Sequence, residues 1–330
     1  MYPLQFEPLF QRYLWGGRRL ADILGKPIGE QDAAESWEIV DHEDGQSVVA
    51  QGPLAGRSLH DVVIEFGEQL VGKQVWKQMN SSGLPPSLRR RFPLLFKFLD
   101  AHRNLSVQVH PDDQMGRELP IPDLGKTEAW VILAAQPGAK LYAGLKEGVS
   151  QTLFLESIKA GTSASMLHSL EPRPGDCILI EAGTMHAIGA GLLVAEIQQA
   201  SNTTFRVFDW NRVDASGQAR PLHIDQAMQA THFDRGPVEI CEPDQIDANR
   251  ERLVACDQFQ LDRLTISKPL SSGGDGNVRL LVCTAGQLQV TSSGAPIQLC
   301  KGQTSLIPAC LGEFELDPGA TSEILEISIP

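Results

Sequence analysis

Short apolar segments bounded by turn-forming residues constrain the fold of this chain more than any other feature of its sequence. Examples are NLSVQVHP (104–111), EAWVILAAQ (128–136), DCILIEAGT (176–184) and GLLVAEIQQ (191–199). Each is rich in Val, Ile, Leu or Ala, is too short for a typical helix, and is bounded by Gly, Pro, Asp or Asn. This pattern predicts a mainly β protein.

Three segments show helical instead of strand periodicity. Residues 58–80 repeat apolar side chains at intervals of three and four, which predicts a helix. Residues 150–170 predict a pair of short helices broken at Ala160–Gly161, and a third helix is predicted near 223–231. We therefore expect a β core with helical insertions at about 56–80 and 150–170.

A polar segment divides the chain near residues 234–250. It contains two prolines and shows no hydrophobic period, whereas strand-like segments resume at residue 259. We predict a first domain at 1–236, carrying the chemistry, and a C-terminal β domain at 237–330 that binds no metal.

A weak internal repeat crosses this boundary. PGDCILIEAGTMHA (174–187) matches KGQTSLIPACLGEF (301–314) in its turn glycine, apolar strand and second turn. Aligning Gly175 with Gly302 places His186 opposite Glu313. The match indicates two similar β domains of which only the first keeps the histidine. The alternative is that any two strand–turn units look alike.

The charge balance excludes several classes of partner. Lys and Arg number 28 and Asp and Glu 41, so the net charge is −13 and the field of the whole chain repels nucleic acid and anionic lipid. A small anion would need a locally basic pocket. The sequence contains no apolar run of about 20 residues and no signal peptide, so we expect a cytoplasmic protein without a membrane partner.

Two further composition features are interpreted as structural. Six cysteines occur without a C-x-x-C pair, which favours reduced, buried thiols over disulfides or a thiolate metal site. The run Arg89-Arg90-Arg91 is interpreted as a solvated turn.

The residues best suited to chemistry lie in SVQVHPDD (106–113), GKTEAW (125–130) and EAGTMHAIG (181–189). Gln108 and His110 point to one face of a strand, and a neighbouring antiparallel strand could present Glu128 to that face. His186 follows a turn into another strand. Two imidazoles and a carboxylate suit a divalent ion, zinc most naturally and iron or manganese as alternatives. Taken alone, Gln108 favours a structural role.

Arg206 is the other candidate that the residue pattern indicates. It lies in TTFRVFDW (203–210), an alternating strand in which Arg206, Thr204 and Phe208 share one face. An arginine between apolar neighbours either pairs with a carboxylate or clamps an anion or a developing oxyanion.

These motifs together resemble the type I phosphomannose isomerases of the cupin superfamily, and most closely their short bacterial branch. The matching segments are FEPLFQRYLWGGRRL (6–20), AAESWEI (33–39), FPLLFKFLDA (92–101), NLSVQVHPDD (104–113), GKTEAWVIL (125–133), PGD with EAGTMHAIGAGLLVAEIQQASNTTFRVFDW (174–210) and RPLHI (220–224). The resemblance implies a bicupin fold of two jelly-roll β-sandwiches. It also implies a zinc-dependent aldose–ketose isomerase that interconverts mannose 6-phosphate and fructose 6-phosphate through a cis-enediol.

The resemblance also implies roles for particular residues. One Zn²⁺ per chain would be bound by Gln108, His110, Glu128 and His186. Arg206, Lys126 and Glu196 would be catalytic, with Lys126 and Glu196 both candidates for the base. The residues that would line the phosphosugar pocket are Trp15, Glu35, Lys97 and Ser106. The sequence assigns no oligomeric state.

Two other classes of function stay open at this point. One is another metal-dependent cupin enzyme, such as a dioxygenase or a sugar epimerase, and the other is a non-catalytic sugar-binding cupin. The Q-x-H of Gln108 and His110 replaces the H-x-H that is usual in cupins, which favours the isomerase over the dioxygenases. The complete ligand set and Lys126 argue against a protein without catalysis.

Overall fold

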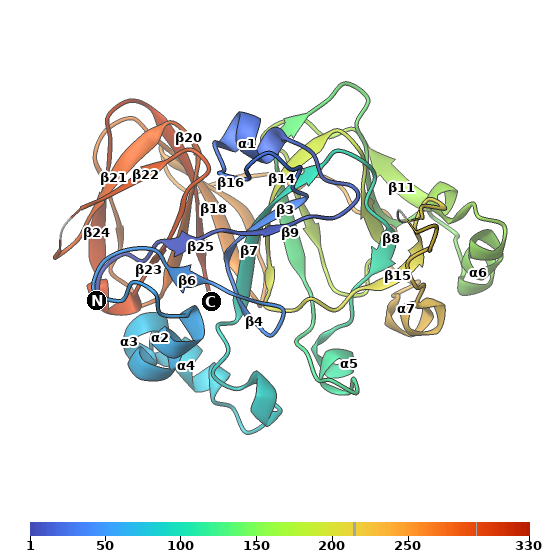
Figure 1. Ribbon diagram of the computed structural model, residues 1–330, viewed down its shortest axis with the longest axis horizontal. Helices are drawn as coiled ribbons and strands as arrows, with labels where there is room; N and C mark the ends of the chain where they lie inside the picture. The colour runs from blue at the N-terminus through green and yellow to red at the C-terminus, as the bar shows by residue number, and fades with distance from the viewer. Residues whose placement is uncertain (214–215, 295) are drawn as a thin grey trace.

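Two pairs of facing antiparallel sheets lie side by side, and the helices lie around their edges (Figure 1). The computed structural model describes residues 1–213, 216–294 and 296–330. The predicted fold class, a mainly β bicupin with helical insertions, is confirmed.

The first sandwich contains the candidate site and is built from a larger and a smaller sheet. The larger sheet has the order β12 (Cys177–Ile180), β9 (Glu128–Ala135), β14 (Leu192–Gln199), β7 (Leu94–Ala101), β3 (Glu35–Ile39) and β2 (Leu9–Gln11). The smaller has the order β11 (Leu167–Leu170), β10 (Leu141–Leu145), β13 (His186–Ile188), β8 (Val107–Val109) and β15 (Phe205–Phe208). Two short pairs flank them, β1 (Phe6–Glu7) with β6 (Val48–Val49) and β4 (Asp41–His42) with β5 (Gly45–Gln46).

The second sandwich repeats this arrangement. Its larger sheet has the order β16 (Asp244–Gln245), β17 (Arg250–Ala255), β18 (Gln260–Ile266), β25 (Ser322–Ser328), β20 (Arg279–Ala285) and β23 (Thr304–Ile307). The smaller has the order β19 (Leu270–Gly273), β24 (Glu313–Pro318), β21 (Gln287–Thr291) and β22 (Ile297–Cys300). The order β12-β9-β14-β7 therefore corresponds to β23-β20-β25-β18, and β11-β10-β13-β8 corresponds to β22-β21-β24-β19. The two segments of the sequence repeat occupy corresponding places: the first runs from β12 into β13, and the second runs from β23 into β24.

The first helical insertion forms where the sequence predicts it, but as three pieces. These are α2 (Leu59–Phe66), α3 (Glu68–Val71) and α4 (Lys73–Met79), which are separated by Gly67 and Gly72. Gly72 has φ +91°, and a Cβ atom there would lie 2.4 Å from the carbonyl oxygen of Gly276 in the second sandwich. The positive φ and the close backbone of the other sandwich leave no room for a side chain, so this position requires glycine.

The second insertion differs from its prediction. A helix forms at α6 (Gln151–Lys159), but the following residues form a 3₁₀ turn at η2 (Ser163–Met166) and then strand β11. Leu170 pairs with Leu141 of β10, so sheet pairing decides the structure of a segment rich in Ser and Thr, which are weak helix formers. The remaining helices are the predicted α7 (Ile224–Ala230) and the unpredicted α1 (Arg19–Leu24), α5 (Asp113–Arg117), η1 (Pro86–Leu88) and η3 (Ala309–Leu311).

The largest apolar core is shared between the two sandwiches. It includes Phe96 and Ala195 of the first together with Leu280 and Leu325 of the second. The N-terminal segment also crosses over, because Leu4 exchanges two backbone hydrogen bonds of 2.8 Å with Leu306 of β23. The predicted boundary at residue 236 stays a prediction, and any two domains must share a hydrophobic interface.

The cysteines partly follow their prediction. All six are free of disulfides, but only Cys177 and Cys283 are buried, and Cys310 is exposed. Within the described ranges, no helix combines the length and the apolar character that a membrane crossing requires.

The shared core predicts that the protein unfolds as one cooperative unit. Leu280 is fully buried, so Leu280→Ala should lower the free energy of unfolding by about 2–5 kcal/mol. Urea denaturation followed by fluorescence should show one transition, shifted as a whole. Leu153→Ala is the control, because Leu153 on α6 is 50 % exposed and its loss should change stability by no more than about 0.5 kcal/mol. A second transition that stays at the wild-type urea concentration would contradict the shared core.

Candidate active site

Three buried side chains from three strands converge inside the first sandwich. His110 directly follows β8, Glu128 begins β9, and His186 begins β13. Strands β8 and β13 are neighbours in the smaller sheet, where His186 lies directly opposite Gln108. Glu128 belongs to the larger sheet and reaches the cluster from the opposite side. The carboxylate therefore comes from the facing sheet and not, as expected, from an antiparallel neighbour of the histidine strand.

These donor atoms are close enough together to hold one metal ion, since one ligand atom from each residue lies within 4.8 Å of the others. The two carboxylate oxygens of Glu128 lie 3.5 Å from His110 Nε2 and 3.5 Å from His186 Nε2. The side-chain amide nitrogen of Gln108 is 3.4 Å from His186 Nε2, and turning the amide over would put its oxygen there instead. Ligands about 2.0–2.2 Å from a tetrahedral zinc are themselves roughly 3.3–3.6 Å apart. In the part of the chain that the structure describes, His110, Glu128 and His186 are the one His/Cys/Asp/Glu group close enough together to hold a metal.

Both histidines are oriented by their second ring nitrogen. His110 Nδ1 is 2.9 Å from the carbonyl oxygen of Thr203, and His186 Nδ1 is 2.9 Å from that of Thr184. A carbonyl oxygen only accepts hydrogen bonds, so each Nδ1 carries the proton and each Nε2 presents its lone pair to the cluster. This is the tautomer that a metal at the cluster requires.

The protonation states also suit a metal. Burial, helped by the Lys126 charge, lowers the pKa of His110 to about 3, and burial lowers the pKa of His186. Burial by itself would raise the pKa of Glu128, but Lys126 and the two histidines outweigh it and hold that pKa well below its usual range. Near neutral pH the cluster thus offers two neutral imidazoles and an ionised carboxylate.

A polar cavity of about 270 Å³ opens onto the cluster. Every site residue expected from the sequence, except His110, lines it. These residues are Trp15, Glu35, Lys97, Ser106, Gln108, Lys126, Glu128, His186, Glu196 and Arg206. The cavity is close to the lower limit of small-molecule pockets, roughly 300–1,000 Å³. The fold therefore brings residues as far apart in sequence as Trp15 and Arg206, which are 191 positions apart, to one place.

Lys97 forms the centre of an ion-pair cluster on one wall. Its ammonium lies 3.1 Å from Glu196 and 3.4 Å from Glu35. Burial disfavours the Lys97 charge, but the carboxylates of Glu196 and Glu35 outweigh this and raise its pKa. Burial and the Glu128 charge raise the pKa of Glu196 to about 7, against the lowering effect of Lys97. Glu196 is thus a carboxyl group that can gain or lose a proton near neutral pH.

The cations near the metal cluster and at the mouth balance these carboxylates. Lys126 Nζ is 2.7 Å from Glu128 Oε2 and 3.0 Å from His110 Nε2. Arg206 lies opposite Gln108 in the sheet, and its Nε donates to Ser106 Oγ at 3.2 Å. Burial and the neighbouring Arg220 lower the pKa of Arg206. The pocket is locally cationic at its mouth although the whole chain is acidic.

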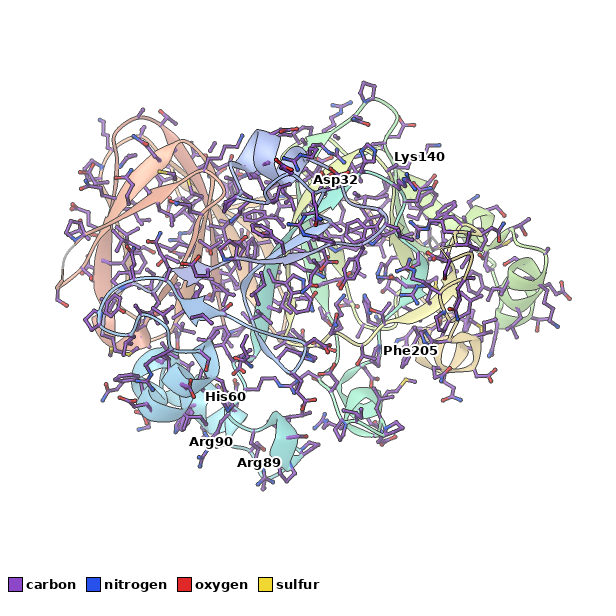
Figure 2. All side chains as sticks on the ribbon, in the orientation of Figure 1. Asp32, His60, Arg89, Arg90, Lys140 and Phe205 are labelled. Carbon is purple, nitrogen blue, oxygen red and sulfur yellow. The ribbon has the colours of Figure 1, made fainter. Side chains whose placement is uncertain are left out.

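Sequence reasoning missed several residues of this pocket. Arg220, Asn202, Thr204 and Tyr13 also line the cavity. Arg220 lies in the RPLHI segment that matches the isomerase family, but the resemblance assigned no role to this arginine. The expectation that Arg89-Arg90-Arg91 is a solvated turn is also partly wrong. Arg89 and Arg90 are exposed (Figure 2), whereas Arg91 is buried and forms an ion pair with Asp123.

Among its described residues, the second sandwich has no such cluster at the matching place. Ile180 pairs with Glu128 in the first sandwich, and Ile307, which matches Ile180 in the repeat, pairs with Arg279. Arg279 forms an ion pair of 2.5 Å with Asp275. A cation replaces the carboxylate, and the arginine disfavours a metal there by charge repulsion.

Fold and site together define a cupin protein with a candidate metal centre in its first sandwich. Comparisons agree with this class. The family model "Phosphomannose isomerase type I, catalytic domain" matches residues 3–128. The chain is 35 % identical to the probable mannose-6-phosphate isomerase GmuF of Bacillus subtilis and 34 % identical to its mannose-6-phosphate isomerase ManA, with 96 % of each chain covered in both alignments.

A solved structure extends the likeness to the whole fold. The crystal structure of mannose 6-phosphate isomerase from Bacillus subtilis superimposes with a TM-score of 0.87, at 28 % identity and with both chains fully covered. The chain belongs to the type I phosphomannose isomerase family. The resemblance stated from the motifs is confirmed, and the chain is an isomerase.

Removing Lys97 should destabilise the protein more at high pH than at low pH. In metal-free Lys97→Met, Glu196 stays buried without its cation, which raises its pKa further above the unfolded value. When a carboxyl group has a higher pKa in the folded protein than in the unfolded protein, the folded protein is destabilised as the pH rises. The full stability is present below the pKa of the unfolded state and is lost as the pH rises through the pKa of the folded state. The loss in unfolding free energy should reach about 3–5 kcal/mol at pH 8 and be smaller at pH 5.

Urea denaturation at both pH values measures this difference. Adding Glu196→Gln to Lys97→Met removes the unpaired carboxylate and should recover much of the loss at pH 8. An equal loss at both pH values would contradict the assignment of a buried, cation-dependent Glu196.

Proposed function

We propose that this chain interconverts mannose 6-phosphate and fructose 6-phosphate, with one Zn²⁺ bound by His110, Glu128, His186 and Gln108. The observation that carries the proposal is the buried cluster of two neutral imidazoles and an ionised carboxylate on the floor of a polar cavity. Its membership of the family supports the substrate, since the relatives GmuF and ManA carry that activity in their names.

The reaction moves a proton between C1 and C2 of the sugar, so negative charge develops on the carbonyl oxygen of a cis-enediol. When bound, the zinc supplies electrophilic stabilisation of that charge. Arg206 is next to the proposed ligand Gln108, and its guanidinium can add charge-assisted hydrogen bonds to the same oxygens. Ser106 fixes the guanidinium by accepting from its Nε.

The chain offers two candidates for the proton-transferring group. Glu196 is favoured, because a general base works best when its pKa is close to the operating pH, and burial places Glu196 near 7. Lys97, 3.1 Å away, can hold its carboxylate in place. Lys126 is the other candidate, but its ammonium is paired with Glu128 at 2.7 Å, which favours a role in holding charge near the metal site.

The cations at the cavity mouth suit the phosphate of the substrate. Arg206 and Arg220 both line it, and Arg220 is held by Asp209 at 2.8 Å. Two arginines can bind a phosphate dianion with several charge-assisted hydrogen bonds. Trp15, Tyr13 and the alkyl part of Leu105 supply an apolar wall against which a sugar ring can lie.

The ligand assignment predicts that activity and metal are lost together. His186→Ala should abolish zinc binding, measured as metal content after dialysis, and reduce turnover of mannose 6-phosphate to background in an assay coupled to fructose 6-phosphate. His168→Ala is the matched control, since His168 lies on β11 in the same sheet but outside the cavity. Full turnover by metal-free His186→Ala would refute the assignment.

The proposed role of Arg206 predicts a different pattern. Arg206→Ala should lower kcat by roughly 10²–10³-fold, the usual loss when an oxyanion-stabilising donor is removed, while zinc content stays at the wild-type level. A kcat close to wild type would remove Arg206 from the chemistry. Turnover that depends on oxygen and on bound iron would instead favour a cupin dioxygenase.

A further inference from the structure

The two histidines of the cluster are oriented in different ways. His186 uses the carbonyl of Thr184, two residues away on its own turn. His110 uses the carbonyl of Thr203, which is 93 residues away on the turn after β14. A local turn fixes its own carbonyl, whereas the Thr203 carbonyl stays in place only if something else holds that turn. The structure therefore has to provide a support for residues 201–203.

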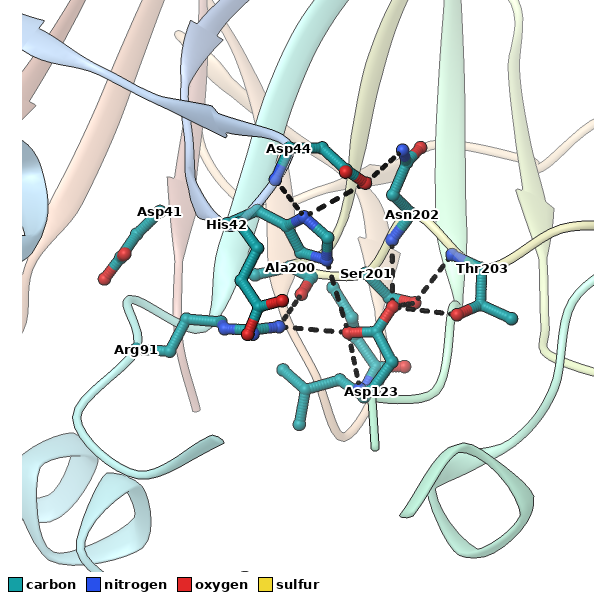
Figure 3. A network of polar contacts seen from close by, with 12 residues as sticks. Asp41, His42, Asp44, Arg91, Asp123, Ala200, Ser201, Asn202 and Thr203 are labelled. Carbon is teal, nitrogen blue, oxygen red and sulfur yellow. Dashed lines mark hydrogen bonds and ion pairs between the residues drawn. The ribbon is translucent and has the colours of Figure 1, made fainter. Parts of the chain in front are cut away.

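The buried carboxylate of Asp123 contacts all three residues of this turn. Gln198 Nε2, which donates to the Ser201 carbonyl at 2.6 Å, and Asp44, which accepts from Asn202 Nδ2 at 2.7 Å, add one bond each. Asp123 Oδ2 accepts hydrogen bonds from Ser201 Oγ at 2.9 Å, from the backbone N–H of Asn202 at 3.1 Å and from Thr203 Oγ1 at 2.8 Å (Figure 3). Asp123 is only 6 % exposed and Ser201 is fully buried. Three donors from three consecutive residues converge on one oxygen, so the turn has little freedom to rotate.

The other oxygen of Asp123 is anchored just as firmly. Oδ1 accepts from Arg91 Nη1 at 3.0 Å and faces His42 Nε2 at 3.5 Å. His42 Nδ1 accepts the backbone N–H of Asp44, so its proton is on Nε2 and points to Asp123. Burial would raise the pKa of Asp123, but hydrogen bonds from His42, Ser201 and Thr203 outweigh it and hold the pKa well below its usual range. Asp123 is therefore ionised and clamped from both sides.

The turn itself divides its residues between two surroundings. Ser201 and Thr203 face Asp123, whereas Asn202 and Thr204 line the active-site cavity. Because Asp123 holds this turn on the side away from the cavity, Asn202 and Thr204 are also held in place on the side that faces the cavity. Asp123 itself does not line the cavity, and the turn that ends at Thr203 connects it to His110.

We propose that Asp123 is a positioning residue for the metal ligand His110. Through Thr203 it fixes the carbonyl that holds the proton of His110 on Nδ1, and so keeps Nε2 free to bind the metal. Supports of this kind, when removed, typically weaken metal affinity by about 10–100-fold. The inference rests on the proposed metal site, but the orientation of His110 can be tested without metal.

The first measurement is the tautomer of His110 in the metal-free protein. In ¹⁵N-histidine spectra, wild-type His110 should carry its proton on Nδ1, and Asp123→Asn should shift it toward a mixture of tautomers. His186 is the internal control, because its partner Thr184 does not depend on Asp123, and its tautomer should not change. The spectrum of His110→Asn identifies the His110 signals.

The second measurement is zinc affinity by competition with a chromophoric chelator. Asp123→Asn should raise the zinc dissociation constant by about 10–100-fold. Thr203→Val keeps the backbone carbonyl but removes Oγ1, so it should also raise the zinc dissociation constant. Thr203→Ser keeps the hydroxyl, so its zinc dissociation constant should stay close to the wild-type value. If both substitutions weaken zinc binding through the same turn, the double variant Asp123→Asn/Thr203→Val should lose less zinc-binding free energy than the sum of the two single losses.

Asp262→Asn is the matched control. Asp262 is a buried carboxylate, 2 % exposed and ion-paired with Arg250, but it lies in the second sandwich. Its loss should lower stability without changing zinc affinity. Unchanged zinc affinity and an unchanged His110 tautomer in both Asp123→Asn and Thr203→Val would overturn the inference. If the wild type binds no zinc, the proposed function fails, while the tautomer of His110 still decides the role of Asp123.

Discussion

The meeting of donor atoms from two facing sheets is the constraint on which the rest of this structure depends. Glu128 crosses from the larger sheet to His110 and His186 of the smaller one, and all three side chains are about 1 % exposed. An ionised carboxylate so deeply buried is costly unless a cation is near it. Lys126 supplies one such charge, and the neutral imidazoles leave room for another. The first cupin sandwich therefore encloses a site whose chemistry suits a metal ion.

The two sandwiches show how little of this chemistry the fold itself requires. Their strand orders correspond, yet Arg279 pairs with Ile307 at the place where Glu128 pairs with Ile180. The second sandwich instead contains an apolar cluster that includes Leu281 and Leu288, and ion pairs such as Arg250 with Asp262 and Glu326 at 2.7 Å. One copy of the fold thus keeps a cavity and a ligand cluster, whereas the other packs apolar side chains and ion pairs. Because the main core is shared, the closed copy can stabilise the open one.

Much of the site could be predicted because its residues lie in short, recognisable motifs. Strand alternation was enough to put Gln108 and His110 on one face, and the motif resemblance pointed to Lys97, Lys126, Glu196 and Arg206, which all line one cavity. The supporting network could not be predicted in this way. Arg91 belongs to a run of three arginines that looks solvated, and Asp123 carries no motif of its own. Their role arises from contacts between residues 32 and 78 positions apart.

The sequence by itself determined the alternating strands, their turns and the candidate metal-binding side chains, because these depend on neighbours a few residues apart. Only the tertiary structure decided that Glu128 approaches from the facing sheet, that residues 167–170 form a strand, and that Asp123 holds the turn beside His110. Such features depend on which strands pair and which sheets face each other. That choice is made by the burial of apolar surface over the whole chain, which no local pattern records.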